Sequence, residues 1–106
     1  MSRITSCELV EWQAAGRYFT LLDVRREGVR AADAAAIPGS RWLEPESVFT
    51  WKDSVPRDRP VVVYCAHGHE ISQGIAATLE AMGLDARYLI DGFTGWRDSG
   101  RPTQSL

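Results

Sequence analysis

The sequence predicts an α/β fold in which a parallel β-sheet carries helices on both faces. Segments typical of strands alternate with segments typical of helices along the 106 residues, as in parallel sheets with right-handed crossovers. The run Val61–Tyr64 holds four consecutive β-forming residues between Pro60 and a glycine-containing turn, which indicates a central strand covered on both faces. A chain of this length can bury one core without disulfides or metal, so we expect residues 1–106 to form a single domain.

In the N-terminal part of the chain, the sequence predicts a short helix followed at once by a strand. Thr5 or Ser6 is suited to capping the helix, and Gly16 is suited to ending it. Aromatic and aliphatic residues over 18–24 then predict a strand. The alanine-rich segment 26–36 is expected to be helical in part.

The middle of the chain is expected to hold short elements joined by turns. Residues 40–43 are expected to be extended, and Pro45 fits the first turn of a helix over 46–52. Three apolar residues of that helix are expected to pack inward: Val48, Phe49 and Trp51. The polar, proline-bounded segment 53–60 is typical of a surface loop.

Beyond the central strand, the sequence predicts a helix, a strand and a terminal helix. Residues 70–82 carry apolar positions at helical spacing, and Gly83 is placed to end that helix. Gly74, inside it, indicates a close approach by another part of the chain. Residues 86–90 then predict a strand, and residues 93–99 predict a helix.

Composition and charge exclude several broad classes of protein. Hydrophobic residues make up 44% of the chain and charged residues 25%, which is typical of a globular domain and not of a disordered or fibrous chain. The 12 basic residues are scattered and nearly matched by 14 acidic ones, so no positive stripe indicates a nucleic-acid partner. The first residues lack both a secretory signal and the roughly 20 apolar residues of a membrane span. We therefore expect a cytoplasmic protein that binds neither nucleic acid nor membrane.

Cys65 is the candidate nucleophile. It follows the central strand, at the carboxyl edge of the sheet where binding sites of open α/β sheets form. The first amides of the following helix favour a thiolate at this place. Segments 23–25 and 91–93 are expected to end at the same edge. The other cysteine, Cys7, is far away in the sequence and is expected to be inert, so neither a disulfide nor a CxxC redox pair is predicted.

Four motifs follow one another along residues 21–102, and their order and spacing carry more weight than any one of them. They are Leu21-Leu22-Asp23-Val24-Arg25, Ile37-Pro38-Gly39-Ser40, Val62-Val63-Tyr64-Cys65 followed by Gly68, and Asp91-Gly92-Phe93 with Trp96. In these motifs the chain resembles the single-domain rhodanese family of rhodanese-like sulfurtransferases. The resemblance implies a parallel five-stranded sheet flanked by helices, with a sulfur-carrying cysteine in a cradle loop.

The resemblance also implies a mechanism. The Cys65 thiolate takes the outer sulfur of a donor such as thiosulfate, and a thiol or cyanide acceptor then removes it from the resulting persulfide. The amides of about residues 66–71, in a loop curled around the sulfur, would stabilise its negative charge, and Gly68 allows the tight curl. The expected substrate-binding residues are Ala66, His67, Gly68, His69, Glu70 and Ile71. Asp23 and Arg25 are expected to support the ends of the loop through an ion pair, and no cofactor is expected.

Glu70 departs from the family pattern, since many members have an arginine there. Two like charges at ~4 Å repel by about 4 kcal/mol at an effective dielectric constant of 20. This repulsion disfavours thiosulfate and favours a less charged sulfane-sulfur donor or a persulfidated protein. His67 and His69 can restore positive charge near neutral pH, although side chains of such a loop are expected to face solvent. A metal site formed by Cys65, both histidines and Glu70 has suitable ligands but crowded spacing, so no metal is expected.

Two other functions remain open. The missing arginine favours a non-catalytic binding or regulatory module with the rhodanese fold. A phosphatase or arsenate reductase on the related scaffold is less favoured, because those enzymes need an arginine that closes a slightly longer cysteine loop. This sequence has Glu70, Ile71 and Ser72 at the corresponding positions.

Overall fold

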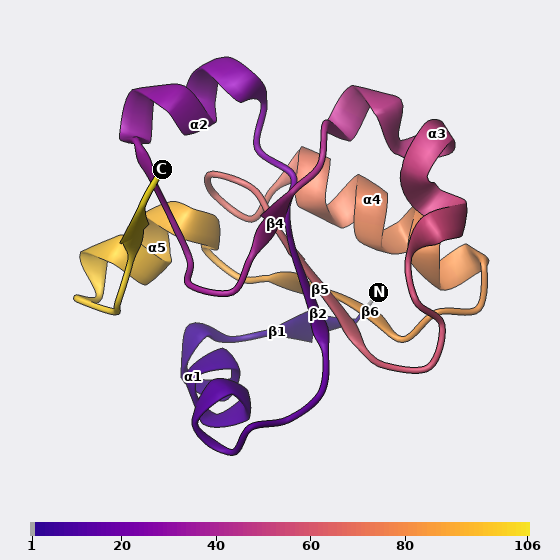
Figure 1. Ribbon diagram of the computed structural model, residues 1–106, viewed down its shortest axis with the longest axis horizontal. Helices are drawn as coiled ribbons and strands as arrows, with labels where there is room; N and C mark the ends of the chain where they lie inside the picture. The colour runs from indigo at the N-terminus through magenta and orange to yellow at the C-terminus, as the bar shows by residue number, and fades with distance from the viewer. Residues whose placement is uncertain (1) are drawn as a thin grey trace.

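The computed structural model describes residues 2–106 and shows a five-stranded parallel sheet between helices (Figure 1). Its strands are β1 (Arg3–Ile4), β2 (Thr20–Asp23), β4 (Arg41–Trp42), β5 (Val61–Tyr64) and β6 (Ala86–Leu89). They lie in the order β1-β6-β5-β2-β4, and every neighbouring pair is parallel. The predicted fold class and the central position of β5 are confirmed. The predicted domain begins with Met1, which lies outside the described residues.

Helices cover both faces of this sheet, as predicted. They are α1 (Ser6–Ala14), α2 (Glu27–Asp33), α3 (Val48–Trp51), α4 (Glu70–Ala81) and α5 (Gly92–Asp98). Residues of α3 and α4 share one hydrophobic core with the sheet, and residues of α1 and α5 share the other (Figure 1). A separate antiparallel pair joins β3 (Ala35–Ala36) to β7 (Gln104–Ser105). None of the helices formed by residues 2–106 is long and apolar enough to cross a bilayer.

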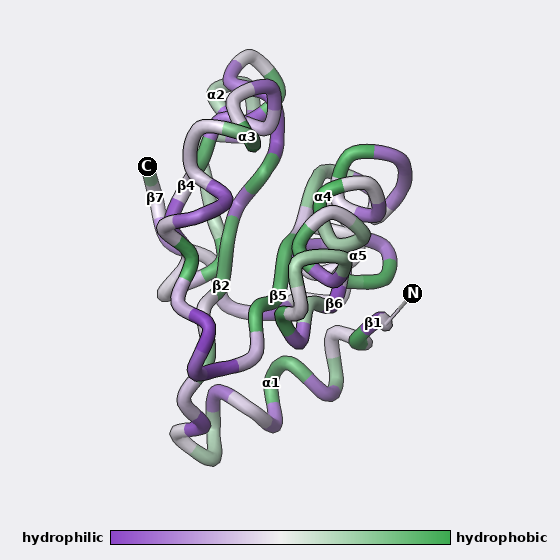
Figure 2. The backbone as a smooth tube through the Cα atoms, turned by 90° about the vertical axis from the view of Figure 1, so that its right-hand side faces the viewer, coloured by the Kyte–Doolittle hydropathy of each residue, from purple (hydrophilic) through white to green (hydrophobic). Residues whose placement is uncertain are grey.

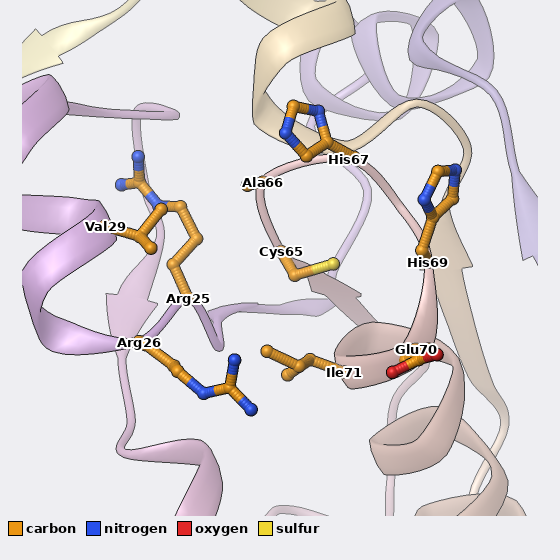
Figure 3. A pocket seen from close by; sticks show the side chains of 9 residues that line it. All are labelled: Arg25, Arg26, Val29, Cys65, Ala66, His67, His69, Glu70 and Ile71. Atoms are coloured by element: carbon orange, nitrogen blue, oxygen red, sulfur yellow. The ribbon is translucent and has the colours of Figure 1, made fainter.

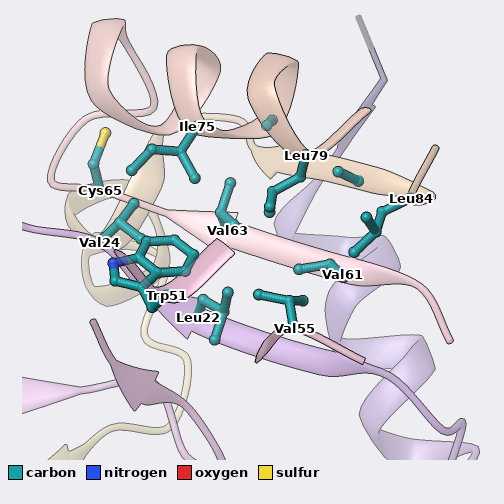
Figure 4. Close-up of a cluster of buried hydrophobic side chains, with 12 residues drawn as sticks. Leu22, Val24, Trp51, Val55, Val61, Val63, Cys65, Ile75, Leu79 and Leu84 are labelled. Atoms are coloured by element: carbon teal, nitrogen blue, oxygen red, sulfur yellow. The ribbon is translucent and has the colours of Figure 1, made fainter. Parts of the chain in front are cut away.

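The central strand β5 supplies side chains to both cores. Successive strand residues point to opposite faces, so Val61, Val63 and Cys65, which follows the strand, pack under α4 (Figure 4). Val62 and Tyr64 belong to the other core, with residues of α1 and α5. All five side chains are buried. This burial on both faces explains the unbroken apolar run in the sequence, which Figure 2 shows as a green stretch along β5. The alternation directs the Cys65 side chain toward α4.

The predicted cap of α1 is confirmed, but the strand before it was missed. Thr5 Oγ1 accepts a hydrogen bond from the Glu8 amide at 3.1 Å, and the Glu8 carboxylate accepts one from the Thr5 amide at 3.1 Å. This reciprocal capping box fixes the start of the helix. The preceding residues Arg3 and Ile4 form β1 by pairing with Tyr88 and Leu89 of β6. Two residues carry no detectable periodicity, so this strand has no sequence signal of its own.

The predicted helix over residues 46–52 was wrong in its extent and in one of its core residues. The segment forms a 3₁₀ turn η1 (Pro45–Ser47), the one-turn helix α3, and a second 3₁₀ turn η2 (Lys52–Ser54). Val48 and Trp51 face the core, but Phe49 is 75% exposed. Residues three apart share a face of a helical turn, and Phe49 lies off that face.

Two smaller predictions were also wrong. The strand expected from residue 18 begins at Thr20, and Tyr18 is exposed under the guanidinium of Arg59, whose Cζ lies 3.9 Å from the ring centroid. Gly74 is exposed, and within residues 2–106 no heavy atom lies within 4 Å of the Cβ that an alanine would place there. The glycine inside α4 therefore does not mark a close approach.

Candidate active site

Cys65 lies at the carboxyl end of β5, at the start of a tight loop over residues 65–69 that leads into α4 (Figure 3). Cys65 is buried, with 6% of the residue exposed. Gly68 has φ +72°, and a Cβ there would lie 2.7 Å from the Leu89 carbonyl oxygen and 2.8 Å from the Asp91 amide nitrogen. The loop therefore needs glycine at this position both for its backbone conformation and for space.

The first turn of α5 holds this loop from behind. The amide of Phe93 donates to the Cys65 carbonyl at 2.9 Å, and the amide of Thr94 donates to the Ala66 carbonyl at 2.9 Å. These two bonds satisfy amides at the beginning of a helix that have no partner within it. They also turn the carbonyls of the loop away from the sulfur, toward α5.

Hydrogen-bond donors converge on the sulfur of Cys65. Its Sγ lies 3.2 Å from the Ser72 Oγ, and the amides of Gly68, His69 and Ser72 also donate to it. The neutral thiol donates to the hydroxyl, whereas the thiolate accepts a hydrogen bond from it. Burial raises the pKa of the Cys65 thiol, but the Ser72 hydroxyl and the three amides together bring the pKa below its ordinary value. The loop therefore favours a thiolate.

The set of donors differs in part from the predicted amides of residues 66–71. Gly68 and His69 contribute as expected, but Ser72 lies just beyond the predicted range and contributes both its amide and its hydroxyl. Its side chain is fully buried on the same helix face as Ile75 and Leu79, toward β5. A polar residue on the apolar face of an amphipathic helix was the sequence signal that could have found it.

The sulfur lies at a pocket of about 420 Å³. The pocket is lined by Arg25, Arg26, Val29, Cys65, Ala66, His67, His69, Glu70 and Ile71 (Figure 3). Five of the six predicted substrate-binding residues are thus brought together with Cys65, while Gly68 is buried behind them. His67 and His69 are exposed, as expected for side chains of a curled loop. Within residues 2–106, no group of three or more His, Cys, Asp and Glu side chains is placed to hold a metal ion.

Two residues of α2 and its cap were missed by sequence reasoning, namely Arg26 and Val29. Arg26 is the N-cap residue of α2, and its side chain is 64% exposed at the pocket. Val29 is 44% exposed on the next turn. Arg26 directly follows the segment 23–25 that was expected at this edge of the sheet. This closeness in sequence could have predicted that Arg26 lies at the site.

Asp23 and Arg25 form a buried ion pair at the end of β2. Arg25 Nε donates to Asp23 Oδ1 at 3.0 Å and Nη2 donates to Oδ2 at 2.7 Å, with side chains 0% and 1% exposed. Nη2 also donates to the Ala35 carbonyl at 2.8 Å, and Cζ lies 4.3 Å from the Phe93 ring centroid. Burial lowers the pKa of Arg25, but Asp23 raises it above its ordinary value, so the guanidinium stays charged. The pair joins β2 to the segment after α2 and to α5.

Comparisons with known proteins define the family. The model of the rhodanese-like domain matches residues 6–99. The thiosulfate sulfurtransferase GlpE of Actinobacillus succinogenes is 38% identical over 86 residues, which cover 80% of this chain and 75% of that protein. The rhodanese-related protein of Thermoplasma volcanium has a structure that superposes with a TM-score of 0.85 at 25% identity, covering 98% of both chains. The chain therefore belongs to the rhodanese-like domain family, and its relatives include sulfurtransferases.

A longer relative shares the same domain. The probable adenylyltransferase/sulfurtransferase MoeZ of Mycobacterium tuberculosis is 34% identical over 104 residues, which cover 95% of this chain but only 26% of that protein. The chain thus spans about a quarter of the length of this relative.

The Ser72 hydroxyl gives a direct test of the electrostatics at the sulfur. We expect Ser72→Ala to raise the pKa of Cys65, because the thiolate loses a hydrogen bond of a kind worth about 1.5–3 kcal/mol. The thiolate is the reactive form, so alkylation of Cys65 by iodoacetamide is expected to shift to higher pH and to slow roughly tenfold near neutral pH. Peptide mapping of the alkylated protein across a pH series measures this.

The same substitution also changes how stability depends on pH. A thiol whose pKa is lower in the folded protein than in the unfolded chain stabilises the fold progressively as pH rises from the folded to the unfolded value. Ser72→Ala should therefore reduce the gain in unfolding free energy over that alkaline window. Ser105→Ala, an exposed site on β7, is the matched control. An unchanged alkylation profile in Ser72→Ala would contradict the assigned role of the hydroxyl.

Proposed function

We propose that this protein is a sulfurtransferase or sulfur carrier in which Cys65 becomes a persulfide. The observation that carries the proposal is the convergence of one hydroxyl and three amides on the sulfur of Cys65, which lines the pocket. Such donors stabilise negative charge on sulfur both before and after another sulfur is attached. In this proposal residues 66–71 bind the substrate, and Asp23 and Arg25 support the loop.

The proposed reaction has two displacement steps at a sulfane sulfur. In the first, the Cys65 thiolate attacks the outer sulfur of the donor, and the donor's leaving group departs with the electron pair of the broken bond. In the second, an acceptor thiolate attacks the outer sulfur of the Cys65 persulfide, and the electron pair of the broken S–S bond returns to Cys65. Sulfur passes from donor to acceptor, the thiolate is regenerated, and no cofactor is needed.

The charges around the pocket bear on the donor. Glu70 is exposed at the pocket, where its carboxylate repels a dianion such as thiosulfate. Arg26 lies at the same pocket and partly offsets this charge. We therefore favour a less charged sulfane-sulfur compound or a persulfidated protein as the donor, although the relative from A. succinogenes is named a thiosulfate sulfurtransferase.

The test is the mass of the intact protein after incubation with thiosulfate, a low-molecular-weight persulfide or inorganic polysulfide. We expect one added sulfur atom that a reducing thiol removes, and no such adduct in Cys65→Ala. Cys7→Ala is the matched control, because it removes the other cysteine, which is exposed on α1, and should leave the adduct intact. If folded wild-type protein acquired no sulfur from any donor, the proposal would fail.

A binding or regulatory module is the second candidate. Glu70 favours it, because the pocket carries an acid at the position where the family resemblance implies an arginine. This candidate predicts that the protein acquires no sulfur at Cys65 and that Cys65→Ala leaves recovery of a partner protein unchanged. The mass measurement therefore separates the two functions.

A further inference from the structure

Two opposite charges flank the pocket at which the sulfur lies. Arg26 comes from the start of α2, and Glu70 is the first residue of α4. Figure 3 shows the side chain of Ile71 between the guanidinium of Arg26 and the carboxylate of Glu70, with the Cys65 sulfur above Ile71 in this view and pointing toward His69. All of these residues line the same pocket.

Both charges are available to a bound molecule. The nearest carboxylate to Arg26 is that of Glu46, 3.9 Å from its Nε, and these two side chains are 64% and 76% exposed. An ion pair so exposed is weak and is easily exchanged for another partner. Glu70 makes no hydrogen bond or ion pair with any side chain among residues 2–106. Arg25 also lines the pocket, but it is buried, its Nε and Nη2 donate to Asp23 and to the Ala35 carbonyl, and its Nη1 lies 3.8 Å from a carboxylate oxygen of Asp33.

We infer that the pocket selects a zwitterionic amino-acid thiol, such as cysteine, as the acceptor of the sulfur held by Cys65. The carboxylate of the acceptor pairs with Arg26 and its ammonium group pairs with Glu70, so its thiolate is presented to the sulfur between them. A pocket of about 420 Å³ is in the size range of small-molecule sites. The inference rests on the proposed persulfide function and adds the chemical class of the acceptor.

The transfer itself is balanced without a further reactant. The acceptor thiolate forms a bond to the outer sulfur of the Cys65 persulfide, the S–S bond to Cys65 breaks, and Cys65 keeps the electron pair as a thiolate. The product is the persulfide of the amino-acid thiol. The charges of Arg26 and Glu70 hold the two charged groups of the acceptor, so its thiol approaches Cys65 in one orientation. A neutral thiol has no such groups and is not oriented in this way.

The experiment measures the rate at which four thiols unload the purified persulfide form, followed by intact mass. The thiols are cysteine, N-acetylcysteine without the ammonium group, cysteamine without the carboxylate, and neutral 2-mercaptoethanol. Arg26→Gln is expected to slow transfer to cysteine and N-acetylcysteine about threefold to fivefold, and Glu70→Gln to slow transfer to cysteine and cysteamine by a similar factor. Each variant is compared with wild type for the same thiol, so the intrinsic reactivity of the thiols cancels.

Two control variants and the pattern of rates decide the outcome. Arg41→Gln and Glu11→Gln remove exposed charges that are not part of the pocket and should leave all four rates unchanged. A variant that changed all four rates by the same factor, or none of them, would overturn the inference while leaving the persulfide function intact. Failure of Cys65 to load sulfur at all would instead refute the proposed function, so the two failures are distinguishable.

Discussion

Replacing Gly92 with alanine is expected to cost at least about 3 kcal/mol of unfolding free energy and to destroy the geometry around Cys65. Gly92 is the first residue of α5, at φ +57°, behind the cysteine loop. A Cβ there would lie 2.5 Å from the Cys65 carbonyl oxygen and 2.6 Å from the Gly68 amide nitrogen. These are backbone atoms that cannot rotate away, so α5 and the loop must separate. Urea denaturation measures the loss of stability.

The matched control is Gly16→Ala. Gly16 also has a positive φ, +65°, but within residues 2–106 no heavy atom lies within 4 Å of the Cβ that alanine would add. It should therefore cost only the roughly 1–2 kcal/mol of a left-handed alanine. Equal losses in the two variants would show that backbone conformation, and not crowding behind the loop, makes glycine necessary at position 92. In the part of Gly92→Ala that remains folded, alkylation of Cys65 should also shift to higher pH.

The second large effect is expected from Asp23→Asn. The substitution leaves the Arg25 guanidinium buried and charged without its carboxylate partner, a change that typically costs about 3–5 kcal/mol. Arg30 loses a partner as well, because its Nε lies 3.3 Å from Asp23 Oδ2. Chemical denaturation of the variant measures the loss.

A double substitution separates the cost of the unpaired Arg25 charge from other effects of changing residue 23. Asp23→Asn combined with Arg25→Met removes both charges, and we expect it to be more stable than Asp23→Asn alone. Asp58→Asn is the comparison for an exposed pair, since Asp58 is paired with Arg59 at the surface, and it should change stability little. If Asp23→Asn cost no more than Asp58→Asn, the buried pair would not be a main support of this edge of the sheet.

Elements with a strong local pattern were predicted well from the sequence. The run Val61–Tyr64 is buried on both faces and reads as a central strand, and α4 carries apolar residues at helical spacing up to Gly83. The capping residue Thr5 likewise acts within a few residues of its partner. In each case the signal and the structure lie in the same short segment.

Elements that depend on distant partners were not predicted. The strands β1, β3 and β7 have two residues each and exist only because other strands pair with them. Phe49 was assigned to the core because it is apolar, but the single turn of α3 cannot bury it together with Val48 and Trp51. The structure at these positions depends on the length of the helix and on pairing with distant strands, and neither can be read from local composition.

The candidate site divides in the same way. Cys65 and the loop after it could be located from a strand, a glycine and a helix start in sequence. Ser72 reaches the sulfur because α4 packs against β5, and Arg26 reaches the pocket because α2 begins at the same edge of the sheet. Ser72 and Arg26 reach the site only because helices pack against the sheet, so the sequence contains only indirect signals for their roles.

The two hydrogen bonds from the first turn of α5 to the Cys65 and Ala66 carbonyls have a consequence for the proposed transfer of sulfur. Because these bonds are made without any substrate, the dipoles around the Cys65 sulfur are aligned when the chain folds and would need no reorganisation during that transfer. The loop around Cys65 is therefore already oriented to solvate a thiolate before any substrate binds.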